Sequence, residues 1–87
     1  MGVTILYYNR FARHYKKMPP AIKDLVEEKE AIFKQDPFDK SLKTHKLHGA
    51  LDGFYAFSLN PEYRIIFKFL NKDTVWLYDI GNHDIYE

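Results

Sequence analysis

Near the start of the chain, the apolar positions change from a strand pattern to a helical one. Residues 3–8, Val-Thr-Ile-Leu-Tyr-Tyr, are mostly β-branched or aromatic, which predicts a strand. From the ninth position onward, Phe11, Tyr15 and Met18 recur at helical spacing, and basic side chains lie between them. Asn9 is suited to cap the start of this helix. We therefore expect a strand followed directly by a helix that reaches Met18.

A second helix is predicted after the pair Pro19-Pro20. Proline cannot continue the first helix, and Pro20 suits the first turn of the next one. An apolar stripe runs along this second helix and is interrupted at Lys29. The stripe consists of Ile22, Leu25, Val26, Ile32 and Phe33. Asp36-Pro37 ends the helix, and the short link between the helices predicts an antiparallel helical hairpin.

The remainder of the chain contains a loop and then three strand patterns. Residues 37–53 lack periodicity and predict a loop with basic and imidazole side chains. Alternating apolar positions then predict strands that contain residues 55–59, 65–69 and 75–80. The segments Asn60-Pro61-Glu62 and Asn71-Lys72-Asp73 are turns between them.

These elements predict the fold class. Residues 1–87 are expected to form a single α+β domain, in which an antiparallel helical hairpin packs on a three-strand antiparallel meander (β-α-α-β-β-β). In the middle strand, alternation directs Arg64, Ile66 and Lys68 away from the core. The last strand is apolar on both faces, so the face that it buries stays open. The sheet residues expected in the core are Phe57, Ile65, Phe67, Val75 and Leu77.

The composition of the chain bears on its core and on its location in the cell. The 87 residues include seven Phe, seven Tyr and one Trp, and such large rings build an efficient core in a small domain. There is no cysteine, hence no disulfide or thiolate site. No apolar run approaches the roughly 20 residues of a membrane span, and the first ten residues lack the layout of a signal peptide. We therefore expect a cytoplasmic protein.

Charge is distributed unevenly although the formal net charge is only +1. Residues 1–50 carry ten Lys and Arg against six Asp and Glu, whereas residues 51–87 carry three against six. This asymmetry permits a local basic face on the helical half. A solvated helix surface explains the same distribution, and composition alone favours that interpretation.

Four histidines are candidates for chemistry. His14 lies among the basic residues of the first helix and fits an ordinary surface position. His45 and His48 have a spacing that metal-binding pairs use. Without a nearby carboxylate or cysteine, such a pair is a weak metal signal, so we expect no metal and no other cofactor. The fourth histidine, His83, belongs to the C-terminal tail.

Arg64 and the tail carry the other candidate groups. Arg64 sits in mid-strand, where it either discourages pairing at a sheet edge or offers planar, bidentate donors to a phosphate. Strand parity does not separate these two interpretations. The tail, residues 81–87 (Gly-Asn-His-Asp-Ile-Tyr-Glu), brings an imidazole, a carboxylate and a phenol together. It is either a solvated terminus or a defined turn with reactive groups.

Three segments carry a resemblance to a known family. Residues 42–49 (Leu-Lys-Thr-His-Lys-Leu-His-Gly), 63–67 (Tyr-Arg-Ile-Ile-Phe) and 79–86 (Asp-Ile-Gly-Asn-His-Asp-Ile-Tyr) come after a strand and a helical hairpin, in this order. The arrangement resembles the RelE/ParE superfamily of type II toxins, above all its RelE-like and YafQ-like members. The likeness spans nearly the whole chain, and the ordered set is more specific than any one segment.

The resemblance implies a toxin that cuts mRNA in the ribosomal decoding site, without a metal and with the RNA 2′-hydroxyl as nucleophile. It also implies a cognate antitoxin protein as partner. Arg64 matches the family's phosphate-contacting arginine, and His83 matches its tail histidine, a general acid or base. His48 and Tyr86 are the further residues implied in catalysis. The side chains implied in RNA binding are Lys43, His45, Lys46 and Lys68.

This sequence departs from RelE, which relies on several lysines and arginines, because its sheet offers only Arg64 and Lys68. That shifts the implied mechanism toward histidines and leaves open which of them is acid and which is base. The main alternative is a ParE-like toxin that binds DNA gyrase and cuts no RNA. Such a protein does not need the loop histidines, His83 and Arg64 together, so their presence favours the nuclease. A repurposed toxin that only binds its partner is a third interpretation.

Overall fold

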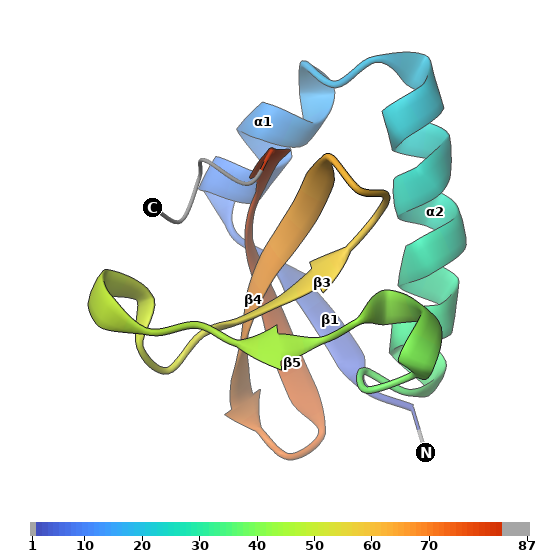
Figure 1. Ribbon diagram of the computed structural model, residues 1–87. Coiled ribbons are helices and arrows are strands. Elements are labelled where there is room, and N and C mark those ends of the chain that lie inside the picture. The colour runs from blue at the N-terminus through green and yellow to red at the C-terminus, as the bar shows by residue number, and fades with distance from the viewer. Residues whose placement is uncertain (1, 83–87) are drawn as a thin grey trace.

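The computed structural model describes residues 2–82, and the predicted order of elements is present within them (Figure 1). The helices and strands are β1 (Thr4–Tyr7), α1 (Asn9–Lys16), α2 (Pro20–Gln35), β2 (His45–Lys46), β3 (Tyr55–Ser58), β4 (Tyr63–Asn71) and β5 (Thr74–Asn82). Two short 3₁₀ turns, η1 (Lys40–Leu42) and η2 (Gly49–Leu51), flank β2. The predicted α+β fold class is confirmed.

The strands form one mixed sheet in the order β1-β5-β4-β3-β2. Strands β3, β4 and β5 are the predicted antiparallel meander. Strand β1 lies parallel to β5, with Thr4 opposite Thr74 and Tyr7 opposite Leu77. Strands β1 and β5 are therefore neighbours in space, although both helices and the other strands come between them in the sequence. In this order β4 is the central strand of the sheet.

The segment predicted as a loop, residues 37–53, contains the additional edge strand β2. This strand pairs His45 with Ala56 and Lys46 with Tyr55. Two residues are too few for a periodic pattern, so the strand has no signature in the sequence. Leu42 and Leu47 are buried on either side of it. These two leucines fasten the segment to the body of the domain.

The helix boundaries depend on backbone contacts and on proline. Asn9 is the first residue of α1 and makes no cap, so the prediction that it caps the helix is wrong. The residue before it, Tyr8, donates its backbone N–H to the carbonyl of Leu77 at 3.0 Å, which ties the start of α1 to β5. Helix α1 ends at Lys16, two residues earlier than predicted. Helix α2 begins with proline in its first turn, as predicted.

Both helices contribute to the main core on one face of the sheet. The ring of Phe33 in α2 lies 4.7 Å from the ring of Phe57 and 4.8 Å from that of Phe67, measured between centroids. The predicted core is confirmed, with Leu25 and Ile32 half-buried at its margin. Its buried members are Val3, Phe11, Ile22, Val26, Phe33, Leu42, Phe57, Leu59, Ile65, Phe67, Val75, Leu77 and Ile80.

An irregularity in β5 decides which of its apolar residues face the main core. Phe67 pairs with Leu77, but Ile66 pairs with Asp79, so Tyr78 is an extra residue in β5. The extra residue changes the alternation and returns Ile80 to the main core. No apolar pattern in the sequence marks this bulge. The sequence therefore did not decide which face of the last strand is buried.

The opposite face of the sheet carries a smaller apolar cluster. Ile66 and Ala56 are buried there beneath Leu47, and Phe54 and Tyr78 pack around them. Because Ile66 lies on this face while its neighbours in β4 belong to the main core, the parity predicted for β4 is confirmed. We call this side the open face. By the same alternation it also carries the side chains at positions 64 and 68 of β4.

Candidate functional site

Arg64 lies on a central strand, and this position bears on whether it protects a sheet edge or offers donors to a phosphate. Strand β4 is paired on both sides, with Ser58 and Gly81 as the partners of Arg64 in β3 and β5. A charge that protects a sheet edge would have to lie on an edge strand. Arg64 does not, so that interpretation is wrong, and its guanidinium needs another explanation.

The guanidinium of Arg64 has N–H donors that the described residues do not pair. Its Nη1 lies 3.4 Å from the carbonyl oxygen of Pro61, at the long end for a hydrogen bond. Its Nε is buried and has no hydrogen-bond partner among residues 2–82. Buried donors are nearly always satisfied by protein or by water, so this donor is open to a water molecule, an ion or a ligand.

A hollow of about 290 Å³ lies at the guanidinium of Arg64. It occupies the edge of β3 beyond Ala56, where β2 has ended and no other strand pairs. Its lining contains three cations and no carboxylate. We call it the basic pocket, and it is lined by Lys29, Ser41, Lys43, Ser58, Leu59, Asn60, Pro61 and Arg64.

Lys43 reaches the basic pocket from an uncommon backbone conformation. It has φ of 53° and ψ of 40° where η1 ends, the left-handed region that residues with a side chain rarely adopt. Its N–H donates to the carbonyl of Lys40 at 3.2 Å, which closes the turn. No other described non-glycine residue has a positive φ. A left-handed residue is a common way for a helical turn to end, and here it sets the point at which Lys43 leaves η1.

The other predicted loop residues lie near the basic pocket but do not line it. His45 pairs with Ala56 and so points to the open face, and its Nδ1 lies 3.1 Å from the carbonyl oxygen of Lys43. His48 is exposed and directly precedes η2. Lys46 lines a separate hollow of about 180 Å³ with Asp52 and Phe54 among its neighbours.

Lys68 is the second cation that β4 directs to the open face. Its Nζ lies 5.3 Å from the centre of the Phe54 ring, a cation–π distance. The structure therefore brings Arg64 and Lys43 together in one pocket and adds Lys68 and His45 on the same face. His83 and Tyr86 lie outside the described residues, so their predicted roles stay predictions.

The sequence did not reveal a cluster around Asp79, the one buried charged residue among residues 2–82. Its two carboxylate oxygens lie 3.0 Å from Arg10 Nε and 2.5 Å from His14 Nδ1. The backbone N–H of Ile80 also donates to Asp79, at 2.8 Å. His14 was expected at an ordinary surface position, but it fastens α1 to β5. Two features of the sequence could have indicated this cluster. Arg10 and His14 are four residues apart and so lie on one side of a helix, and Asp79 is an aspartate within an apolar strand.

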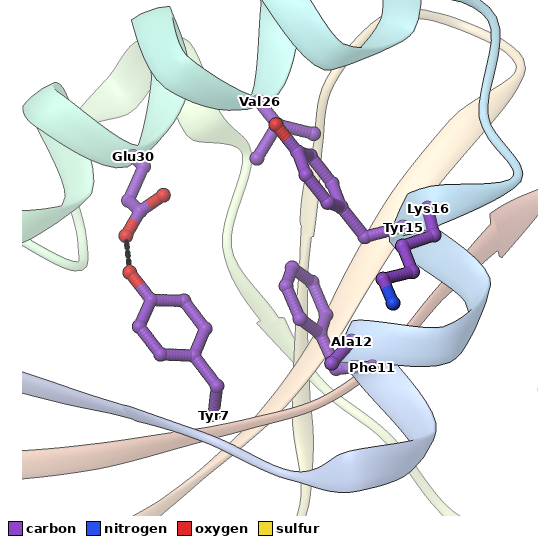
Figure 2. Close-up of a pocket in the computed structure, with 7 residues that line it drawn as sticks. All are labelled: Tyr7, Phe11, Ala12, Tyr15, Lys16, Val26 and Glu30. Atoms are coloured by element: carbon purple, nitrogen blue, oxygen red, sulfur yellow. Dashed lines mark hydrogen bonds between the residues drawn. The ribbon is translucent and has the colours of Figure 1, made fainter.

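A second hollow is an apolar cleft of about 430 Å³ between the end of β1, α1 and α2 (Figure 2). Figure 2 shows Phe11 and Tyr15 inside it, while the hydroxyl of Tyr7 donates to the carboxylate of Glu30. Burial, together with Glu30, raises the pKa of Tyr7 far above its usual value. The remaining charged group in the lining is Lys16. This cleft offers an apolar surface and no paired acid and base.

Within residues 2–82, no three His, Asp or Glu side chains gather closely enough to hold one metal ion. No helix in the same range is long and apolar enough to cross a membrane.

Comparison with known proteins gives a clear result for the fold. No protein-family model matches this sequence, and no curated protein matches it either. Among solved structures, YafQ from E. coli is 16% identical, with a TM-score of 0.79 over 95% of this chain and 96% of that chain. The toxin–antitoxin complex RelBE2 from Mycobacterium tuberculosis is 19% identical, with a TM-score of 0.77 over 94% and 99%. The archaeal RelE-RelB complex from Pyrococcus horikoshii is 20% identical, with a TM-score of 0.75 over 94% and 96%. The chain has the RelE/YafQ-like fold of these toxins, so the resemblance seen in the sequence is confirmed for the fold.

Proposed function

We propose that this chain is the toxin of a type II toxin–antitoxin pair and that it cuts mRNA in the decoding site of the ribosome. The proposal starts from the shared fold with YafQ and RelE toxins. Fold alone does not define an activity, so the argument depends on the site. The observation that carries it is Arg64, a guanidinium on the open face with an unpaired buried Nε beside Lys43.

The proposed reaction is a transesterification within the RNA. A base removes the proton of a 2′-hydroxyl, and this oxygen bonds to the adjacent phosphorus while the bond to the 5′-oxygen breaks. An acid returns a proton to the departing 5′-oxygen. The products end in a 2′,3′-cyclic phosphate and a 5′-hydroxyl. Negative charge rises on the phosphate oxygens in the transition state, and a fixed cation lowers that barrier.

In this scheme the residues of the chain divide into three groups. Arg64 supplies the fixed cation, because its planar donors suit two phosphate oxygens at once. His83 is the proposed acid or base, with His48 as the second candidate and Tyr86 as a stacking partner for a base. The RNA backbone is held by Lys43, His45, Lys46 and Lys68.

The proposed protein partner is an antitoxin. The solved structures that share this fold include toxin–antitoxin complexes, such as DinJ-YafQ from E. coli. A partner with an acidic segment would be attracted to residues 1–50, which hold the excess of positive charge. Because its substrate is the ribosome-bound message, we place the toxin in the cytoplasm.

The test is single-turnover cleavage of mRNA on programmed ribosomes, with the ends of the products mapped. Cleavage within the decoding site by the wild-type chain, and its loss in a folded Arg64→Ala, His83→Ala double variant, are the expected results. Equal cleavage by the double variant would reject this site. Intact mRNA together with inhibition of gyrase supercoiling would instead assign the chain to the ParE-like gyrase poisons.

A further inference from the structure

The basic pocket joins cations from three separate elements. Arg64 comes from β4, Lys43 directly succeeds η1, and Lys29 comes from α2. In the sequence, Lys29 only interrupts the apolar stripe of α2, and the proposed reaction gives it no role. The structure shows it half-buried at the wall of this pocket. A lysine at such a position costs side-chain freedom and hydration, which a bound anion would offset.

The polar groups of the pocket favour an anion as its occupant. The side-chain oxygen of Asn60 already accepts the N–H groups of Glu62 at 2.9 Å and Tyr63 at 2.7 Å. That leaves the amide nitrogen of Asn60, a donor, for the pocket. Lys29 and Lys43 add their ammonium groups. These donors favour an occupant that supplies oxygen atoms.

The carboxylate of Asp39, next to the lining residue Ser41 in the sequence, is already engaged. Asp39 Oδ1 accepts the N–H of Ser41 at 2.9 Å and its hydroxyl at 2.7 Å. These bonds lower the pKa of Asp39, and the charge of Lys29 lowers it further. Asp39 compensates Lys29 in part, while Lys43 and Arg64 have no acidic partner in the lining. The pocket thus keeps an excess of positive charge.

The lining of the pocket bears on which phosphate it would bind. Of the histidines proposed for the reaction, neither His45 nor His48, the two that the structure describes, lines the pocket. Arg64 belongs both to the pocket and to the open face, where His45 also points. A strand of RNA that places one phosphate in the pocket can therefore present the next one to the open face.

We propose that the basic pocket binds a phosphodiester of single-stranded RNA next to the scissile one, and that Lys29 is a contact for it. This inference rests on the proposed function, because it takes RNA as the substrate. Lys29 and Lys43 then position the strand, while the transition-state charge is left to Arg64.

The test is binding of a 2′-O-methyl RNA oligonucleotide, which lacks the nucleophile and cannot be cut, measured by fluorescence anisotropy at several salt concentrations. The logarithm of the binding constant falls linearly with the logarithm of the salt concentration. Removal of one phosphate-binding cation makes this slope shallower by about 0.7 for a single strand. Lys29→Gln and Lys43→Gln are each expected to lower the slope by this amount. Lys29→Arg keeps the charge and should retain the wild-type slope.

Lys72→Gln is the matched control, because Lys72 is exposed in the turn at the far end of β4 from Arg64. A Lys29→Gln slope equal to that of wild type, or an equal decrease in Lys72→Gln, overturns the inference. So does a wild-type chain without salt-dependent binding of the oligonucleotide. If Lys29→Gln weakens the antitoxin complex and leaves RNA binding unchanged, the pocket belongs to an acidic protein segment.

The outcome separates this inference from the proposed function. On programmed ribosomes, Lys29→Gln should raise the toxin concentration needed for half-maximal cleavage and leave the maximal single-turnover rate unchanged. A reduced salt slope with no cleavage by the wild-type chain supports the pocket and rejects the nuclease. Cleavage by the wild-type chain, together with a wild-type salt slope in Lys29→Gln, supports the nuclease and rejects the pocket.

Discussion

At the scale of single residues, Arg64 shows how a sheet positions a charged side chain. The next residue in β4, Ile65, is fully buried in the main core, so the backbone at this point has little freedom. Gly81 across the sheet has no side chain, and Ser58 on the other side has a short one. The backbone that carries the guanidinium is therefore held in place, and the buried Nε has no partner among residues 2–82. A donor that is oriented in advance stabilises developing charge without a reorganisation cost.

Replacement of Arg64 tests this arrangement directly. Arg64→Ala is expected to lower the single-turnover cleavage rate by about 10²–10³, because it removes one charge-stabilising interaction of the transition state. Arg64→Lys keeps the charge but not the planar pair of donors, so it should recover only part of the rate. Circular dichroism should show an unchanged fold. A folded Arg64→Ala protein with the wild-type rate contradicts the assignment.

The histidines give a second residue-scale prediction. His83→Ala is expected to lower the cleavage rate by about 10²–10⁴, the usual effect of losing a general acid or base. His48→Ala should weaken cleavage, and His45→Ala should do so less. The products should carry a 2′,3′-cyclic phosphate, detected by resistance of the RNA end to ligation without end repair. Inhibition by EDTA at constant ribosome integrity would return the pair His45 and His48 to consideration as a metal site.

At the scale of elements, α1 continues the edge of the sheet where β1 stops. Strand β1 pairs with β5 only as far as Leu77, and α1 begins two residues after β1 ends. Beyond that point Asp79 of β5 is held by Arg10 and His14, one turn apart on α1. The buried carboxylate thus joins a helix to a strand at the place where strand pairing ends.

Removal of that carboxylate should loosen the packing of α1 against β5. Asp79→Ala is expected to lower the free energy of unfolding by about 1–3 kcal/mol, since it leaves polar partners unsatisfied. The decrease stays in this range because Arg10 and His14 are half-exposed and can be hydrated. Arg13→Gln on the same helix is the control and should change stability by less than about 0.5 kcal/mol. Urea unfolding measures both, and equal midpoints would refute a stabilising role for Asp79.

The packing of α2 on the sheet gives a further prediction at this scale. Phe67 is fully buried against Phe33, so Phe67→Ala should cost about 3–5 kcal/mol of unfolding free energy. Leu70→Ala in the same strand is the control, because Leu70 is half-exposed and should matter little. Thermal unfolding followed by circular dichroism distinguishes the two. A Phe67→Ala protein that melts like its parent would contradict the core described above.

At the scale of the whole molecule, charge and apolar surface are separated. Most of the positive charges of residues 1–50 belong to the two helices, η1 and the short β2, while residues 51–87 carry a negative balance. The basic pocket lies at the open edge of β3, and the apolar cleft lies between β1, α1 and α2. One small domain thus offers two distinct surfaces to its surroundings.

The whole molecule is the scale at which an antitoxin should act. Expression of this chain alone should stop growth, and co-expression of the protein encoded by the adjacent gene should restore growth and co-purify with it. Association should become slower and weaker as salt rises, because opposite charges steer the two proteins together. Neighbouring genes whose products neither bind this chain nor rescue growth would count against the toxin assignment.

Local features were readable from the sequence because they depend on adjacent residues only. The proline pair separated the helices, the apolar stripe marked the buried side of α2, and alternation put Ile65 and Phe67 opposite Ile66. These patterns express backbone geometry and the exclusion of apolar groups from water. Together with the order of elements, they were sufficient for the fold class.

The site needed information that no local pattern contains. Strand order placed β4 at the centre and ruled out an edge role for Arg64. The bulge at Tyr78 returned Ile80 to the core, and packing brought Asp79 against Arg10 and His14. Likewise, Lys29 meets Lys43 and Arg64 only after α2, η1 and β4 have packed. Distances between such remote side chains are set by strand register and by the mutual fit of whole elements, and these are properties of the assembled core.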